Sequence, residues 1–113
     1  MYHKMEIQLD EEKFKAEGKD VAEYEKYLDD LCAEVGLVRD RGFTGSLMYY
    51  NPLQEYGFDS VGAMYLELKR DQFFVDRCKK WLCLKYKTLD QAYHTGFAED
   101  ALARALRARA KMI

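Results

Sequence analysis

The side chains that could do chemistry in this sequence are few and widely separated. The two histidines, His3 and His94, lie near opposite ends of the chain, and neither serine stands in a nucleophile motif. No phosphate-binding loop, G-x-G-x-x-G fingerprint or H-E-x-x-H zinc motif is present. Because catalysis needs acid, base and nucleophile groups that converge, the sequence favours a non-enzymatic role. It predicts no catalytic residue, no metal and no cofactor.

The three cysteines give no metal or disulfide pattern. Cys78 and Cys83 are five residues apart, which places them on different faces of a predicted helix with no histidine nearby, and this is a poor zinc spacing. Cys32 lies in another predicted helix. An odd number of cysteines is typical of free thiols, and we expect all three to be small buried hydrophobic residues.

One group of polar residues leaves a small-molecule site or an enzyme open as an alternative. Tyr50, Tyr56 and Asp59 lie on or beside a predicted hairpin, and His94 precedes a Thr-Gly pair at a helix junction. A cleft at the hairpin would bring them together. A simpler interpretation makes Asp59 the cap of a turn.

A basic C-terminal stretch raises a second alternative, nucleic-acid binding. Four cations, Arg104, Arg107, Arg109 and Lys111, recur along a predicted helix. Such a stripe could contact a few phosphates, with weak and salt-sensitive binding. The favoured interpretation is that the arginines form the solvated side of a helix whose leucines face the protein.

Composition and charge describe one globular unit with a polarised charge. The chain has 113 residues, of which 49% are hydrophobic and 34% charged. Residues 1–60 carry 7 Lys/Arg and 14 Asp/Glu, whereas residues 61–113 carry 11 and 6. No apolar run approaches the length of a membrane span, and no signal-peptide core is visible. We therefore expect a single domain over residues 1–113, in a cytoplasmic, bacterial-type protein without a membrane partner.

The first half of the chain has clear patterns of secondary structure. Residues 1–10 alternate, with Met5, Ile7 and Leu9 on a buried face and Lys4, Glu6, Gln8 and Asp10 on a solvated one, which predicts a strand. Asp20 begins a helix that Gly36 ends. Residues 37–42 suggest a short strand and turn. Residues 43–50 predict a further strand; with Phe43, Leu47 and Tyr49 pointing inward, Met48 and Tyr50 point outward.

The second half is organised around residues 60–86. Val61–Lys69 has apolar residues at alternate positions on both faces, which predicts a central strand that forms a hairpin with residues 43–50. Asp71 is expected to cap a helix that runs to residue 86. Residues 97–113 are rich in Ala, Leu and Arg and predict a C-terminal helix.

These elements predict an α+β fold. The order β-α-β-β-α-α gives a three-stranded, mostly antiparallel sheet with helices packed on it, in a layout that resembles a truncated ferredoxin-like, or split βαβ, arrangement.

The surplus of aromatic residues supplies the leading functional hypothesis. Nine Tyr, six Phe and one Trp make up 14% of the chain, and several lie on the predicted hairpin and its sheet face. Two helices could cover only one face of the sheet. The sequence therefore predicts a protein-interaction or accessory module that uses the second face, either as a homodimer or as an inhibitor that docks on a larger protein. The predicted interface residues are Met48, Tyr50, Tyr56, Phe58 and Tyr65.

Overall fold

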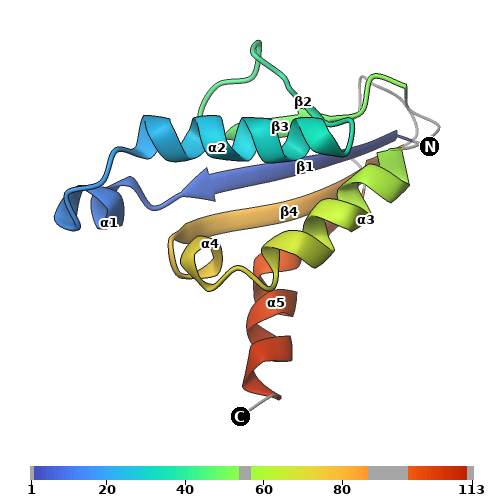
Figure 1. The fold of residues 1–113 in the computed structure, drawn as a ribbon. Helices are drawn as coiled ribbons and strands as arrows, with labels where there is room; N and C mark the ends of the chain where they lie inside the picture. The colour runs from blue at the N-terminus through green and yellow to red at the C-terminus, as the bar shows by residue number, and fades with distance from the viewer. Residues whose placement is uncertain (1, 54–56, 87–96, 112–113) are drawn as a thin grey trace.

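The computed structural model describes residues 2–53, 57–86 and 97–111 and shows an α+β fold. Its five-stranded antiparallel sheet has the order β2-β3-β1-β4-β5 (Figure 1). The strands are β1 (Tyr2–Leu9), β2 (Val38–Arg39), β3 (Leu47–Tyr50), β4 (Cys78–Tyr86) and β5 (Phe97–Asp100). The expected count of three strands is therefore wrong, and the central strand is β1.

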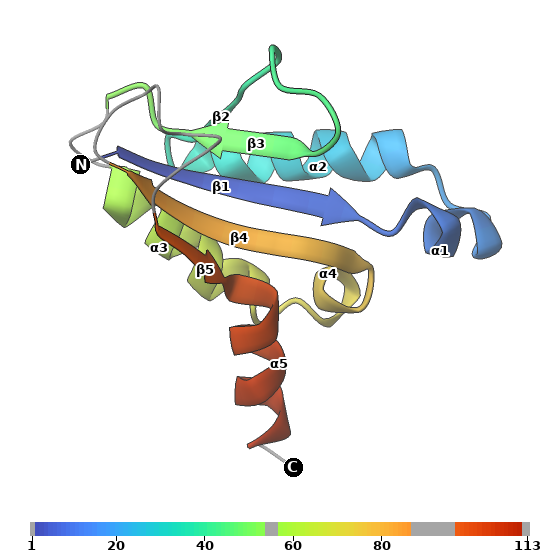
Figure 2. The ribbon, with the colours of Figure 1, turned by 180° about the vertical axis from the view of Figure 1, so that it is seen from behind.

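Helices cover one face of this sheet, called here the front face. The helices are α1 (Glu11–Ala16), α2 (Val21–Glu34), α3 (Gly57–Leu68), α4 (Gln72–Asp76) and α5 (Ala101–Ala110). Figures 1 and 2 place α2, α3 and α4 on the same side of the sheet. In both views α5 projects from the end of the molecule opposite α2.

The predictions for the first half are confirmed in their main features. β1 forms at the alternating segment, and α2 begins after Asp20, whose carboxylate accepts a hydrogen bond from the Ala22 amide at 2.9 Å. Gly36 follows the helix with φ 85°, a left-handed conformation that glycine adopts without a steric cost. The short β2 forms within residues 37–42 as expected, whereas β3 covers only the second half of the strand predicted over residues 43–50, and Phe43 lies outside it.

The predicted strand Val61–Lys69 is wrong, because these residues belong to α3. Val61, Met64 and Leu68 are buried at helical spacing, whereas Leu66 is 49% exposed. A short apolar run is compatible with both the two-residue repeat of a strand and the 3.6-residue repeat of a helix. Ala63, Met64, Leu66 and Leu68 are also good helix formers. With the strand replaced by a helix, the predicted hairpin does not form.

The predicted helix over residues 71–86 is largely wrong. Asp71 does cap a helix, since its carboxylate accepts from the Phe74 amide at 3.2 Å, but α4 ends at Asp76. From Cys78 the chain forms β4, which pairs with β1 along nearly its whole length. Here strand pairing, a contact distant in sequence, outweighs a local helical pattern.

The C-terminal helix begins later than predicted. Residues 97–100 form the edge strand β5, and Asp100 then caps α5 by accepting from the Ala103 amide at 2.9 Å. The predicted order β-α-β-β-α-α is wrong after β3, because α3 replaces the expected third strand and the strands β4 and β5 follow α4; the truncated split βαβ layout is not confirmed.

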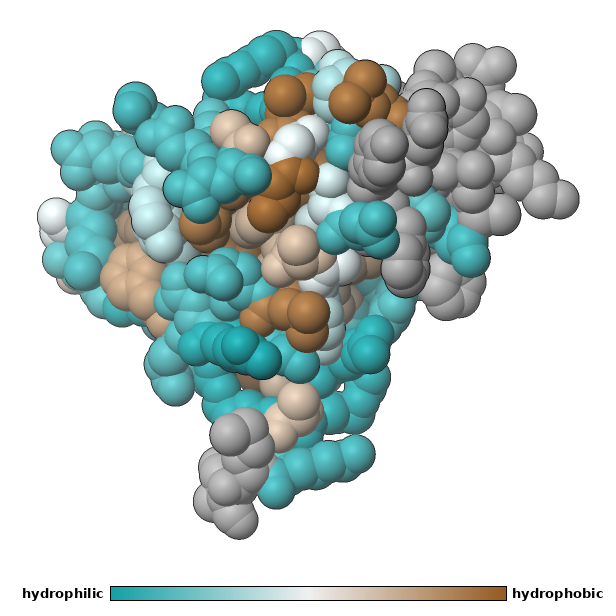
Figure 3. Space-filling view, turned by 45° about the vertical axis from the view of Figure 1, so that its right-hand side comes forward, coloured by the Kyte–Doolittle hydropathy of each residue, from teal (hydrophilic) through white to brown (hydrophobic). Residues whose placement is uncertain are grey.

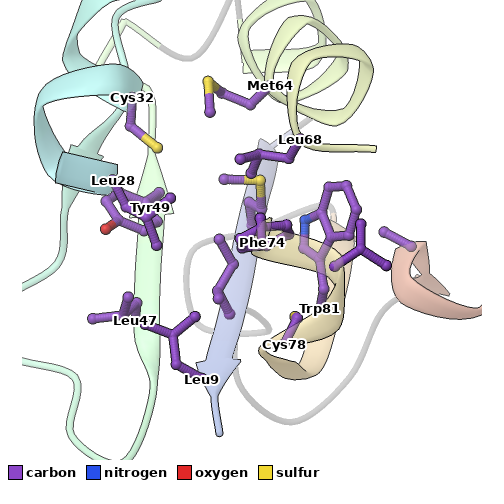
Figure 4. Packing of buried hydrophobic residues seen from close by; sticks show 14 of the residues in the cluster. Leu9, Leu28, Cys32, Leu47, Tyr49, Met64, Leu68, Phe74, Cys78 and Trp81 are labelled. Atoms are coloured by element: carbon purple, nitrogen blue, oxygen red, sulfur yellow. The ribbon is translucent and has the colours of Figure 1, made fainter. Parts of the chain in front are cut away.

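The hydrophobic core lies between the front face and its helices (Figure 4). Trp81 is fully buried and meets Phe74 edge to face at 5.1 Å and Tyr65 at 5.4 Å between ring centroids. Tyr49 is also fully buried and donates a hydrogen bond to Asp29 of α2 at 2.6 Å. The strands β1, β3 and β4 therefore present a continuous apolar surface to the helices.

A buried polar relay joins three segments at one end of this core. The Asn51 side-chain amide donates to the Ser60 hydroxyl at 2.9 Å, and that hydroxyl donates to the Val35 carbonyl at 2.7 Å. The relay links the end of β3 with the start of α3 and the end of α2. Gly36 lies beside the relay, since a Cβ there would be 3.4 Å from the Asn51 amide nitrogen.

Candidate functional site: the rear face of the sheet

The face of the sheet opposite α2, α3 and α4, called here the rear face, is the candidate site. Side chains alternate along each strand, and the register aligns Lys4 with Tyr50 and Leu84, and Glu6 with Met48 and Leu82. In the described part of the chain no helix lies across this face (Figure 2). The rear face consists of Lys4, Glu6, Gln8, Val38, Met48, Tyr50, Lys80, Leu82 and Leu84.

Glu6 is the centre of one polar contact set on the rear face. Its side chain accepts a hydrogen bond from the Ser46 hydroxyl at 2.6 Å and pairs with the Lys80 ammonium at 2.9 Å. Glu6 as a whole is only 9% exposed, whereas the Lys80 side chain is 43% exposed. The carboxylate is thus held by two partners, and the lysine retains access to water.

Lys4 forms a second contact set beside the first. Its ammonium lies 3.8 Å from an Asp40 carboxylate oxygen and 5.6 Å from the centre of the Tyr50 ring. Burial lowers the pKa of the Lys4 ammonium, and the nearby Asp40 opposes that shift. Lys4 remains only 5% exposed.

The prediction that Lys4 and Glu6 lie on a solvated face is therefore wrong in one respect. They do lie on the face opposite Met5 and Ile7, but they are buried. β1 is the central strand, so side chains of β3 and β4 flank both residues. The alternation predicts correctly that Lys4 and Glu6 face the same way. Their partners, Lys80, Ser46 and Asp40, depend on the register of the strands, which the sequence alone does not give.

The five predicted interface residues do not form one surface. Met48 and Tyr50 lie on the rear face as the predicted parity requires, although Met48 is 1% exposed and Tyr50 is half-buried. Tyr65 lies on the front side, between Trp81 and the Arg104 guanidinium, which is 4.9 Å from its ring centre. Tyr56 and the side chain of Phe58 lie outside the described residues.

The basic stripe of α5 is divided by internal ion pairs. Arg104 pairs with Glu99 at 2.7 Å, and Arg109 pairs with Asp76 at 3.1 Å. Arg107 and Lys111 are exposed and form no ion pair with the described residues. Two cations one helical turn apart thus remain for an anionic partner, and nucleic-acid binding stays a prediction.

The residues predicted for a small-molecule site are only partly described. Asp59 is exposed in the first turn of α3, and His94 and Tyr56 lie outside the described residues. The hairpin that was to form their cleft is absent, because its second strand is α3. Among the residues that the structure describes, no cluster of three or more His, Cys, Asp or Glu is placed to hold a metal ion.

The three thiols are held in their protonated form. Burial raises the pKa of Cys32 and of Cys78 to about 12 and that of Cys83 to about 11. A nucleophilic cysteine needs a lowered pKa, so their surroundings disfavour that role. The expected burial holds for Cys32 and Cys78, and Cys83 is partly buried.

Comparison with known proteins gives no relative on which a function could be based. No protein-family model, curated protein or solved structure matches the chain. Within the described ranges, no helix is both long and apolar enough to cross a membrane.

Proposed function

We propose that this protein is a non-catalytic interaction module that binds a partner protein through the rear face of its sheet. The observation that carries the proposal is the unequal cover of the two faces. Three helices pack on the front face, and no described helix crosses the rear face, where Tyr50, Leu82 and Leu84 are only partly buried and Val38 is 42% exposed. An antiparallel sheet can leave one face to solvent, but that face is then usually polar.

The mixture of groups on the rear face supports recognition of a protein. Tyr50, Leu82 and Leu84 offer apolar area, and the charged groups beside them are already paired with one another. Paired charges cost less to desolvate than free ones, and they fix the orientation of a partner. Tyr50 carries both an apolar ring and a polar tip, a combination that is enriched at interfaces.

The front side offers a weaker candidate surface. Figure 3 shows a largely hydrophilic surface with separate hydrophobic patches. Leu66 is exposed there, but it belongs to a helix whose apolar side is already packed against the sheet. Single exposed leucines are normal on soluble proteins.

Site-specific photo-crosslinking in cells tests the proposal. A photoreactive phenylalanine analogue is placed at Leu84 on the rear face and, as the matched control, at Leu66 on α3, and adducts are identified by mass spectrometry. The proposal predicts one defined protein adduct, a second copy included, from position 84 and none from position 66. Adducts from neither position, or the same adducts from both, would contradict it.

A surface substitution gives the complementary test. Leu84→Lys should abolish the adduct formed from a neighbouring rear-face position, Leu82, because a charge would then have to be buried in the interface. Leu66→Lys should leave that adduct unchanged. Circular dichroism and urea unfolding of both variants separate a lost contact from a lost fold.

A further inference from the structure

Two exposed helix faces of this chain, separate from the rear face, are complementary to each other. On α2 the outward side carries Glu23, Tyr27, Asp30 and Glu34, which are all exposed and follow one another at helical spacing. On α5 the outward side carries Leu106 and Arg107, and Lys111 caps its C-terminal end; all three are also exposed. We propose that α5 of one copy docks on α2 of a second copy of this chain, so that the protein self-associates through these two helix faces.

Each face has one large exposed apolar residue among its charges. Tyr27 is 48% exposed on α2, and Leu106 is 47% exposed on α5. Burial of these two side chains against each other would remove apolar surface from water, and Tyr is common at the centre of interfaces. Charge supplies the direction of the contact, since one face is acidic and the other basic.

The spacing of the charges also agrees. Asp30 and Glu34 are four residues apart on α2, and Arg107 and Lys111 are four residues apart on α5. Four residues advance a helix by about 6 Å. Two ion pairs could therefore form together when the helices lie side by side. Surface ion pairs are individually weak, so the association is expected to be weak and salt-sensitive.

The carboxylates at the C-terminal end of α2 are disfavoured by the dipole of their own helix. Glu34 is the last residue of α2, and the last turn of that helix contains no basic residue. The carboxyl end of a helix carries partial negative charge, which repels a carboxylate and attracts a cation. A cation from another molecule would interact favourably with both the helix end and the carboxylates. Within the described residues, Asp30 pairs only with Lys26, at 3.4 Å, and both side chains are well exposed.

The contact must form between molecules. In Figures 1 and 2, α2 lies at one end of the molecule and α5 projects from the other. Arg107 and Lys111 therefore cannot reach α2 of their own chain. The internal pairs of α5, Arg104–Glu99 and Arg109–Asp76, join that helix to β5 and α4.

Sedimentation velocity of the full chain over a concentration series tests the proposal. We expect species larger than one chain to accumulate with concentration at low salt, and the association to weaken about tenfold or more in about 0.5 M salt, where charge interactions are screened within a few ångströms. A single monomeric species at every concentration in low salt would overturn the proposal.

Charge-reversal variants assign the contact. Asp30→Lys with Glu34→Lys reverses α2, and Arg107→Glu with Lys111→Glu reverses α5. Each double variant alone should associate at least about tenfold more weakly than the unmodified chain, since like charges then meet. An equimolar mixture of the two should associate again, because each reversed face finds its complement in the other variant.

The matched control reverses the same number of charges elsewhere. Glu11→Lys with Glu12→Lys changes two exposed acidic residues of α1 and should leave the association unchanged. Circular dichroism confirms that every variant is folded. Association that survives both helix variants, or a mixture that stays monomeric, would refute the α2–α5 contact. Neither outcome bears on the rear face, because none of these substitutions touches it.

Discussion

The two faces of the sheet are built from alternate residues of the same strands, yet they differ in almost every physical respect. On the front face Met5, Ile7 and Trp81 are completely buried under helices. On the rear face the corresponding positions of the same strands carry Lys4, Glu6 and Leu82. The front face therefore supplies most of the folding free energy. The rear face combines buried, paired charges with apolar groups that are only half-covered at Leu82 and Leu84, and these two side chains can be changed with less damage to the fold.

The largest expected effect comes from the front face. Trp81→Ala should lower the free energy of unfolding by about 3–5 kcal/mol, because it leaves a cavity beside Phe74 and Tyr65. Leu84→Ala on the rear face should cost about 1 kcal/mol, since that side chain is partly exposed already. Urea unfolding of both variants measures the contrast. Equal losses would show that the rear face is as tightly packed as the front.

Trp81→Phe separates the contribution of the indole nitrogen from that of the buried ring. The indole nitrogen of Trp81 is buried without a hydrogen-bond partner among the described residues. Phenylalanine removes this unpaired donor, so it should cost clearly less than alanine. A loss as large as that of Trp81→Ala would mean that the indole nitrogen is in fact paired.

Glu6 should give the next largest effect. Glu6→Ala removes the partner of both Ser46 and Lys80 and should lower the free energy of unfolding by about 1–3 kcal/mol. Glu6→Gln keeps an acceptor for Ser46 and should recover part of that loss. Urea unfolding near neutral pH is the measurement. If neither variant loses stability, the rear-face charges do not contribute to folding.

The thiols of the front side should make the protein sensitive to alkali. Their folded pKa values, about 12 for Cys32 and Cys78 and about 11 for Cys83, lie above the ordinary value of 9.0. Above pH 9 the unfolded chain loses these protons first, so stability is complete below pH 9 and falls as the pH rises toward the folded values. Each thiol contributes up to about 1.4 kcal/mol per pH unit.

Cys32→Ala isolates one thiol. The variant loses the packing of the Cys32 side chain, which lowers the free energy of unfolding at every pH. The decline of this free energy above pH 9 should become less steep than in the unmodified chain. Urea unfolding at several pH values between neutral and alkaline conditions gives the slope. An unchanged slope would mean that Cys32 ionises equally well in the folded and unfolded chain.

Lys4 should give the smallest effect, and its pH dependence has the opposite sign. Lys4→Met replaces a buried ammonium by an apolar side chain of similar length. The Asp40 side chain that loses this partner is 26% exposed and can be hydrated, so stability should change by less than about 1 kcal/mol. Because burial lowers the pKa of Lys4 below 10.5, its contribution to stability rises with pH as the folded chain releases the proton first. The variant should lose this rise. A loss of several kcal/mol near neutral pH would instead make the Lys4–Asp40 pair a main support of the fold.

Local signals sufficed for the first half of the fold. β1 was predicted correctly from the alternation of Met5, Ile7 and Leu9, and α2 from the N-cap at Asp20. Both signals lie within the element that they predict. Residues 60–86 could not be predicted in this way. Val61, Met64 and Leu68 fit a helix as well as a strand, and β4 exists through its pairing with β1, which no local pattern records.

The candidate site was predictable to a similar extent. The parity that turns Met48 and Tyr50 away from Leu47 and Tyr49 is a local property and is confirmed. The contacts of Glu6 with Ser46 and Lys80 are not local, since they join residues about 40 and 74 positions apart that only the sheet register brings together. The position of Tyr65 on the front side likewise depends on α3 being a helix.

In the relay from Asn51 to the Val35 carbonyl, the single hydroxyl oxygen of Ser60 connects the end of β3, the start of α3 and the end of α2. Displacement of the Ser60 hydroxyl would therefore remove, in one event, a contact of the end of β3 and a contact of the residue that caps α2. Local opening at the start of α3 is consequently coupled to both neighbouring segments.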